Sequence, residues 1–407
     1  MNRAAVVALG IFAILGGLGL GMVAAMASSP SGRPAAGSGL VAGLGSLPPL
    51  SAPTPSPNGS ASIAPPGSAS PTVAPTPTPS PTPILVPAPL TGRLVSPAAA
   101  TRHPIAIMID DQFDARPQSG FNSASVVWQA PAEGGIPRYM MVFQENIPTD
   151  LGPVRSSRYY YIAWAAELRA LYVHAGGSPQ ALDALRSQGS GQLVYNADEF
   201  RWGGSFHRIS TRFSPHNLYT SGAKLRAIAK TVGAKDGAIK WPWTFAPDVP
   251  FLFRPVGGRI VVDYGLGTNI IRYDYDRTTN TYLRSVTGEK RQVDAATNGR
   301  VAPKNVIVMQ MHFGPLNDNN PKKHRLEAQI IGSGPAWIST NGVTIAGTWK
   351  KTSLKSPTRF FDKAGNPVVL TIGQTFVQVM KTTDSISFVA GSPAPPPDST
   401  PPLRGAV

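Results

Sequence analysis

The stretch of sequence that decides the fold covers residues 116–158 and reads RPQSGFNSASVVWQAPAEGGIPRYMMVFQENIPTDLGPVRSSR. Two short apolar runs within it, residues 125–130 and 139–144, predict two buried strands. Charged residues surround these runs, among them Arg116, Glu133, Arg138, Arg155 and Arg158. Because several of the arginines stand near Pro or Gly, we expect them at turns and strand ends, where their side chains can converge.

Arginine in such a place has two interpretations. The guanidinium fork fits carboxylate and phosphate groups, which favours a site for an anion. Alternatively, the arginines form ion pairs that lock loops, with Glu133 and Asp114 as their partners. Only 14% of the residues in the chain are charged, so this concentration of arginine is a candidate site under the first interpretation and a structural device under the second.

The rest of the first half alternates between predicted strands and helices. Residues 105–109 and 171–175 are short apolar runs typical of buried strands. Ser156 is a candidate N-cap for a helix that extends to about residue 169, and Ser178 with Pro179 begins a second helix. A third helix is expected over residues 221–232. This order predicts an α/β-type N-terminal domain.

The second half reads differently. Residues 270–276 (IIRYDYD) alternate strictly between two faces, as in a half-buried strand. Further strands are predicted over residues 306–313, 343–347, 368–372 and 376–380, and few helical patterns follow residue 232. The chain as a whole is therefore predicted to be α+β, with a C-terminal subdomain that is rich in antiparallel β-structure.

Three further stretches accompany the arginine-rich one: LYVHAGGSPQAL at 171–182, SPHNLYTS at 214–221 and IAGTWKKTSLKSPTRFFDKAGNPVVLTIGQTFVQVM at 345–380. Together they resemble the YerB-like family, bacterial envelope lipoproteins built around a domain of unknown function. The resemblance covers most of residues 100–390. It implies an N-terminal domain over 91–244 and a β-rich C-terminal domain over 245–391, and it implies no particular activity.

The N-terminus predicts export. Arg3 precedes residues 4–27, a run without charge that is long enough as a helix to span a bilayer core of about 30 Å. We expect residues 1–27 to be a single-pass anchor in the cell membrane, with the rest of the chain on the extracytoplasmic side. A cleaved signal peptide is the alternative, since Ala25-Met26-Ala27 fits a cleavage site. The chain has no cysteine, which excludes the N-terminal lipidated cysteine common in the family.

Residues 28–90 contain mainly Pro, Ser, Ala, Gly and Thr with one charge, Arg33, and predict a disordered linker. Residues 392–407 predict a tail of the same kind. The net charge of +15 falls mostly on the folded part and favours anionic surroundings such as phospholipid headgroups or wall polymers. No nucleic-acid-binding motif is found, so we expect no nucleic acid as a partner.

Catalytic signals are sparse. His174 lies inside a predicted strand, shortly before the Gly176-Gly177 turn, and His216 ends the loop HRISTRFSPH at 207–216. These two histidines and one of Asp110, Asp111 or Asp114 could converge at strand ends. The chain has no HExxH motif, no G-x-S-x-G motif and no phosphate-binding loop, so we assign no metal and no other cofactor.

The sequence thus favours binding over catalysis. We predict an arginine-lined cleft that holds an anionic envelope ligand or a partner protein. The candidate ligand-binding residues are Arg116, Gln118, Glu133, Arg138, Arg155, Arg158, His174, His216 and Asn217. Two alternatives remain open: an envelope hydrolase or transferase that uses His174, His216 and a carboxylate, and a purely structural scaffold.

Overall fold

The computed structural model describes residues 83–394, with the exception of 266 and 268. The predicted anchor over residues 1–27 lies outside the described residues, as do most of the predicted linker and most of the tail. Within the described part of the chain, no helix is long and apolar enough to cross a membrane. The structure corrects the predicted end of the linker over residues 28–90. Its last residues form the short strand β1 (Val86–Pro87), and Ala88 and Leu90 are buried.

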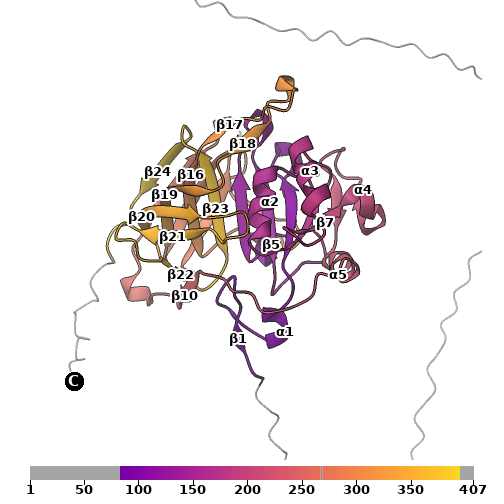
Figure 1. Ribbon diagram of the computed structural model, residues 1–407. Helices are drawn as coiled ribbons and strands as arrows, with labels where there is room; N and C mark the ends of the chain where they lie inside the picture. The colour runs from indigo at the N-terminus through magenta and orange to yellow at the C-terminus, as the bar shows by residue number, and fades with distance from the viewer. Residues whose placement is uncertain (1–82, 266, 268, 395–407) are drawn as a thin grey trace, which may run out of the picture. The chain divides into compact units, whose positions relative to one another are not determined.

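A ten-stranded sheet organises the described residues, in the order β21-β20-β19-β16-β23-β4-β5-β3-β6-β7 (Figure 1). Its strands are β3 (Ile105–Asp110), β4 (Val126–Ala130), β5 (Arg138–Phe143), β6 (Leu171–His174), β7 (Tyr195–Asp198), β16 (Asn305–Met311), β19 (Gly332–Thr340), β20 (Val343–Lys351), β21 (Arg359–Asp362) and β23 (Thr375–Lys381). Strand β4 pairs in parallel with β23, so one sheet joins the two regions that the sequence separates.

Strand direction gives this sheet two distinct edges. Strands β16, β23 and β4 are parallel to one another, as are β3, β6 and β7, and β5 is antiparallel to both β4 and β3. These six parallel strands therefore end on the same side. We call the row of strand ends on that side the carboxyl edge of the sheet, and the row of strand starts on the opposite side the amino edge. Loops at the carboxyl ends of parallel strands are the usual place for a binding site.

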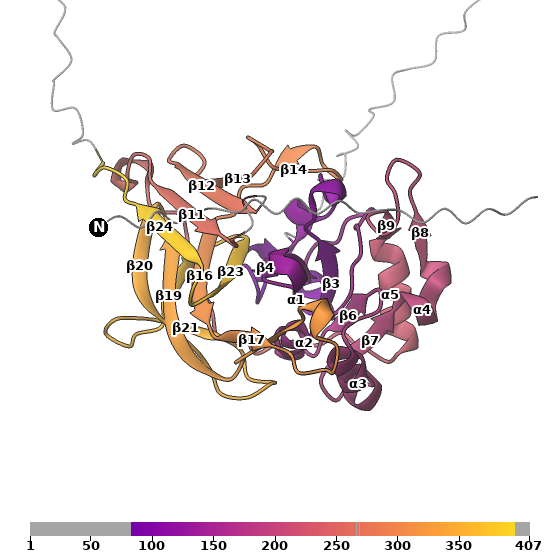
Figure 2. The ribbon, with the colours of Figure 1, turned by 90° about the horizontal axis from the view of Figure 1, so that it is seen from above.

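Both faces of the sheet are covered, which explains why β3 is buried along its whole length and is apolar up to its last residue, Asp110. One face packs against helices α2 (Tyr159–Ala166) and α3 (Pro179–Gln188). The other face packs against helix α5 (Gly222–Thr231) and a second sheet of order β13-β12-β11-β24 (Figure 2). The strands of that second sheet are β11 (Arg259–Asp263), β12 (Ile270–Asp276), β13 (Thr281–Val286) and β24 (Ser385–Val389).

Short elements complete the described chain. They are β2 (Leu94–Val95), α1 (Pro97–Ala100), α4 (Glu199–Trp202), β8 (Phe206–Arg208), β9 (Leu218–Thr220), β10 (Thr244–Ala246), β14 (Val293–Asp294), β15 (Gly299–Arg300), β17 (Phe313–Pro315), β18 (Leu326–Ala328) and β22 (Val369–Thr371). Strands β17 and β18 form a hairpin that extends from the carboxyl edge, whereas β10 and β22 lie at the amino edge.

The mixed α/β architecture and the β-rich second region agree with the sequence, and the burial of β12 alternates as predicted. One helix start was wrong. Helix α2 begins at Tyr159, because residues 155–157 are extended and bond to the loop after β6, so Ser156 is not its cap. The aromatic residues of α2 are core residues: Trp164 stacks on Trp128 with ring centroids 4.9 Å apart.

Candidate functional site

The candidate site lies where β3 and β6 separate at the carboxyl edge. The two strands pair only up to Ile107, and beyond that point the segment 153–157 is inserted between them. Its backbone bonds to β3 on one side, where the N–H of Arg155 donates to the Met108 carbonyl at 2.9 Å. On the other side, the N–H of Ser157 donates to the Gly176 carbonyl at 2.9 Å. This insertion carries Arg155 and Arg158 to the edge where β3, β4 and β6 end.

A shared carboxylate is the centre of the site. Glu133 lies in a 3₁₀ turn (Glu133–Gly135) after β4, and three guanidinium groups face it. Arg138 Nη2 is 3.2 Å from Glu133 Oε2, Arg158 Nη2 contacts Oε1, and Arg325 Nε is 3.9 Å from Oε1. Arg325 also pairs with Asp318. We call these five residues the Glu133 cluster. Three cations and two carboxylates leave it with one excess positive charge.

Electrostatics keep the cluster charged. Burial alone would raise the pKa of Glu133, but Arg138 and Arg158 outweigh burial and hold that pKa below its ordinary value. Burial lowers the pKa of the Arg158 guanidinium, and the neighbouring Arg138 lowers it further. The side chains of Arg138 and Arg325 keep 12% and 17% of their surface exposed, so solvent reaches the cluster.

Backbone carbonyls orient two of these arginines. Arg138 Nη1 donates to the Ser156 carbonyl at 3.2 Å, and Arg158 Nη1 donates to the Ser157 carbonyl. The inserted segment therefore orients both Arg138 and Arg158, which follows it directly in the chain. A fixed guanidinium loses less conformational freedom when it binds an anion.

A second group of polar side chains surrounds Asp110 at the end of β3. Its Oδ2 accepts from His216 Nδ1 at 2.8 Å and lies 3.0 Å from Arg155 Nε. Gln118 Nε2 donates to the Asp110 backbone carbonyl at 2.9 Å. Asp110 pairs in register with Arg138 across β3 and β5, which places this group next to the Glu133 cluster. The structure thus brings Arg138, Arg155, Arg158, Glu133, Gln118 and His216 to one edge.

Asn217 and His174 lie near this edge and stabilise loops. Asn217 Nδ2 donates to the carbonyls of Ile209 and Arg212, and its Oδ1 accepts from Arg208 Nη1. His174 is fully buried: its Nδ1 donates to the Gly176 carbonyl at 2.8 Å, and its Nε2 lies 2.8 Å from Asn196. His174 and His216 therefore contact different partners. Within residues 83–394, leaving aside 266 and 268, no group of three or more His, Asp and Glu side chains could hold a metal.

Arg116 belongs to a different environment. Its guanidinium donates to the carbonyls of Thr287 and Asp111 at 3.0 and 3.2 Å, and lies 3.5 Å from the Asp111 carboxylate. Asp111 rather than Asp114 is its acidic neighbour. Gln129 Nε2 donates to Asp111, and Arg284 of β13 donates to Gln129 Oε1 and to the Tyr273 hydroxyl at 2.7 and 2.9 Å. We call Asp111, Arg116, Gln129, Tyr273 and Arg284 the Asp111 network. It is buried between the two sheets.

A cleft of about 770 Å³ adjoins the Glu133 cluster beneath the β17–β18 hairpin. Its lining includes apolar residues such as Phe313, Leu316 and Leu326, and the cations Arg325 and Lys381. Arg325 is thus part of both the cleft and the cluster. Sequence reasoning missed Arg325, Asp318 and Lys381. The one sequence signal for these residues was the polar run that follows the predicted strand 306–313. It could be used only with the knowledge that β16 lies in the sheet parallel to β23.

Comparison with known proteins shows the family of the chain. The family model described as the N-terminal domain of a protein of unknown function, DUF3048, matches residues 90–235, and the corresponding C-terminal model matches residues 260–377. The chain belongs to the DUF3048 family. It is 29% identical over 313 residues to a Bacillus subtilis (strain 168) protein named "Putative lipoprotein YerB", which covers 75% of this chain and 89% of the relative. The predicted family resemblance is confirmed.

The crystal structure of the YerB protein from B. subtilis is also similar, with a TM-score of 0.66 and 27% identity. The similarity covers 74% of this chain and 99% of the solved one. In this DUF3048 chain, both family regions contribute to the Glu133 cluster. Glu133, Arg138 and Arg158 lie in the N-terminal match, and Asp318 and Arg325 lie in the C-terminal match. The site is therefore complete only when both regions are present.

Proposed function

We propose that this DUF3048 protein is a membrane-anchored, exported binding protein of the bacterial cell envelope. Its Glu133 cluster, together with the adjoining cleft, would hold an anionic group of an envelope ligand or of a partner protein. One observation carries this proposal: three arginines from both family regions meet at one glutamate, beside a cleft, with an excess of positive charge.

The chemistry of the site supports an anion. Glu133 and the carbonyls of Ser156 and Ser157 orient Arg138 and Arg158 while solvent still reaches the cluster. An incoming phosphate or carboxylate would receive charge-assisted hydrogen bonds from guanidinium groups that are already in place. Each such bond contributes about 1.5–3 kcal/mol. Lys381, which also lines the cleft, would add a further positive charge for a larger anion.

The name of the B. subtilis relative supports an extracytoplasmic, membrane-associated location. This chain contains no cysteine to carry a lipid, so a different anchor is needed. We propose that residues 4–27, which contain no charged residue, supply it as a single transmembrane segment. The folded part would then lie outside the cell.

The proposal is tested by titrating the full chain, in detergent micelles, with inorganic phosphate in a calorimeter. Arg325→Ala should weaken phosphate binding by about tenfold, the lower end of the range for one charge-assisted bond. Arg359→Ala, at an exposed arginine of β21, should leave the affinity unchanged and is the matched control. Equal phosphate affinity in the wild type and Arg325→Ala would contradict the proposal.

One contact favours a second candidate, an envelope hydrolase or transferase. Asp110 Oδ2 accepts a hydrogen bond from His216 Nδ1 at 2.8 Å, and this geometry would orient the imidazole as a general base. His174, the other predicted member, contacts Asn196 and the Gly176 carbonyl instead. Hydrolysis of p-nitrophenyl esters or phosphates by the full chain, abolished in His216→Ala, would establish this candidate.

A further inference from the structure

The amino edge of the large sheet carries a concentration of exposed apolar side chains. Eight of the fifteen large apolar residues that are exposed in the described part of the chain lie there, so their exposure is not scattered at random. They are Ile84, Leu85, Leu94, Phe251, Leu252, Phe253, Val343 and Val369. Leu252 and Phe253 expose 56% and 73% of their surface. Exposed apolar side chains that concentrate on one side of a protein usually mark an interaction site.

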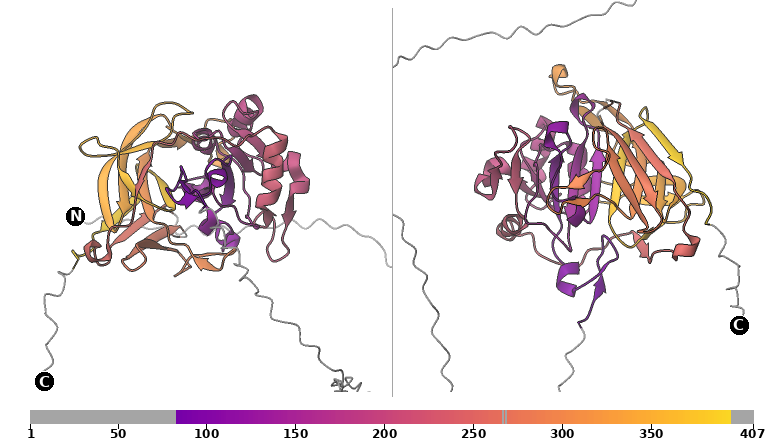
Figure 3. Two further views of the ribbon diagram at one scale, coloured as in Figure 1. Left: turned by 90° about the horizontal axis from the view of Figure 1, so that it is seen from below. Right: turned by 180° about the vertical axis from the view of Figure 1, so that it is seen from behind.

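Hydrogen bonds join the elements that carry these residues into one surface. The β1–β2 hairpin is fixed to the turn before β23, where the N–H of Gly373 donates to the Thr91 carbonyl at 2.8 Å. Strand β22 pairs with β10, and the chain after β10 leads to the 3₁₀ turn Phe251–Phe253. Val249, just before that turn, donates its N–H to Asn341 between β19 and β20 at 3.3 Å. We call this surface the amino-edge face, and the left view of Figure 3 looks onto this side of the ribbon from below.

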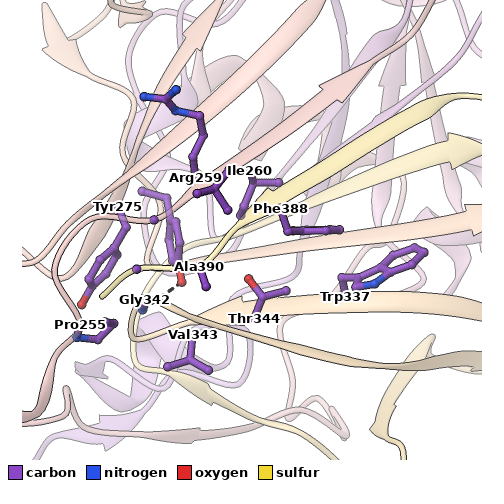
Figure 4. Close-up of a pocket in the computed structure, with 14 residues that line it drawn as sticks. Pro255, Arg259, Ile260, Tyr275, Trp337, Gly342, Val343, Thr344, Phe388 and Ala390 are labelled. Atoms are coloured by element: carbon purple, nitrogen blue, oxygen red, sulfur yellow. Dashed lines mark hydrogen bonds between the residues drawn. The ribbon is translucent and has the colours of Figure 1, made fainter. Parts of the chain in front are cut away.

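An apolar pocket of about 420 Å³ opens beside the same turn (Figure 4). Its lining includes Pro255, Tyr275, Trp337, Val343 and Phe388. The rings of Trp337 and Phe388 lie 5.6 Å apart. The amino-edge face can therefore accept apolar groups as well as present them.

Cations surround the exposed aromatic turn. The guanidinium of Arg277 lies over the Phe251 ring at 4.2 Å from its centroid and also donates to the Phe251 carbonyl at 3.0 Å. Arg254 and Lys304 share Asp248, at 3.6 and 2.7 Å. With Asp276 also nearby, the positive charges still outnumber the negative ones. Exposed aromatic and aliphatic side chains bordered by Arg and Lys are typical of surfaces that insert into the headgroup region of a bilayer.

The path of the chain also favours a membrane as the partner of the amino-edge face. The described residues begin at Pro83, followed by the exposed Ile84 and Leu85 of the amino-edge face. The 82 residues before Pro83 include the charge-free run 4–27. An anchor in that run would tether the folded part by this face and raise the local concentration of lipid around it.

We propose that the amino-edge face lies against a phospholipid bilayer, with the Phe251–Phe253 turn in the headgroup region and Arg277 at lipid phosphates. The carboxyl edge, with the Glu133 cluster, then points away from the membrane toward envelope ligands. This inference rests on the membrane location proposed above, but not on the identity of the bound anion.

The absence of cysteine makes a direct test simple. The full chain with Leu252→Cys is labelled with an environment-sensitive fluorophore and reconstituted into phosphatidylcholine vesicles that contain phosphatidylglycerol and a lipid bearing a nitroxide quencher. The label should be quenched about threefold more strongly than one at Lys322→Cys, on the exposed 3₁₀ turn Pro321–Lys323 of the carboxyl-edge hairpin. Adding Phe253→Ser should reduce the quenching, whereas adding Phe213→Ser, at an exposed phenylalanine elsewhere, should not.

Vesicle flotation of the same samples separates the possible failures. If the chain floats but the two labels are quenched equally, the membrane-facing surface is refuted while the anchor stands. If the chain does not float, both are refuted. The fluorescence emission of the Leu252→Cys label could instead shift with protein concentration in the absence of lipid. That result would assign the face to a second copy of the chain, which also overturns the proposal.

Discussion

The Glu133 cluster and the Asp111 network both combine arginine with a carboxylate near the carboxyl edge. They differ in how completely their side chains are closed off from solvent. In the Asp111 network, the side chains of Arg116 and Asp111 are 2% and 0% exposed, and Gln129 and Tyr273 surround Arg284. In the Glu133 cluster, three arginines share Glu133, solvent reaches them, and a cleft adjoins. The comparison teaches that the number of arginines does not reveal a site. Both groups carry one excess positive charge, so they differ in closure from solvent rather than in charge.

The largest expected effect is on stability in the closed region. Arg284→Met should lower the free energy of unfolding by about 3–5 kcal/mol, because it leaves the buried Asp111 with less compensating charge. Urea denaturation of the full chain in detergent measures this value. Arg359→Met, at an exposed position, is the control and should change it by less than about 0.5 kcal/mol. If Arg284→Met changes the free energy of unfolding as little as the control does, the Asp111 network is not the structural element that the comparison requires.

The two carboxyl groups should respond to pH with opposite signs. Burial raises the pKa of Asp111 to about 6 from an ordinary value of 3.8, so the folded state binds this proton more tightly than the unfolded state. Stability from this group is therefore greatest below pH 3.8 and is lost as the pH rises to about 6. Its contribution is at most about 3 kcal/mol. The pKa of Glu133 is lowered, so its contribution is present above pH 4.5 and is lost as the pH falls through the folded-state pKa.

This contrast is measured by the free energy of unfolding at about pH 4 and about pH 6.5. Compared with the wild type, Asp111→Asn should lose relatively more stability at the lower pH, and Glu133→Gln relatively more at the higher pH. The same pH response in both variants would show that the two regions are electrostatically alike.

A buried ion pair joins the two family regions and offers a further comparison. Lys351 of β20 lies 2.6 Å from Glu167 at the end of α2, and both side chains are almost fully buried. Burial raises the pKa of Glu167 and lowers that of Lys351, and each opposes the other's shift. Lys351→Met should cost about 3 kcal/mol, and adding Glu167→Gln should restore part of it. If the double variant is as unstable as the single one, the loss comes from packing rather than from charge.

Local patterns carried the predictions that the structure confirmed. Strand β3 and the alternating strand β12 were predictable because their apolar spacing is set by a few neighbouring residues. Pairings between distant segments were not. The parallel pairing of β4 with β23 joins the two regions in one sheet, and Arg325 lies beside Glu133 because such distant segments meet.

The same limit explains Arg116. In the sequence it resembles Arg138, with a proline as neighbour and an apolar run nearby. Its burial depends on Asn269 and Thr287, which follow 153 and 171 residues later in the chain. The start of α2 was missed for a similar reason, because residues 155–157 satisfy their backbone groups with the distant β3 and the loop after β6.

Arg138→Lys tests the central claim most directly, with phosphate affinity and unfolding free energy measured on the same full-length sample. Lysine keeps the positive charge but cannot form the same fork of hydrogen bonds. The account predicts that the Kd for phosphate rises by about tenfold or more while the free energy of unfolding changes by less than about 1 kcal/mol. An unchanged Kd with a loss of about 3–5 kcal/mol in stability would contradict it and identify the Glu133 cluster as structural.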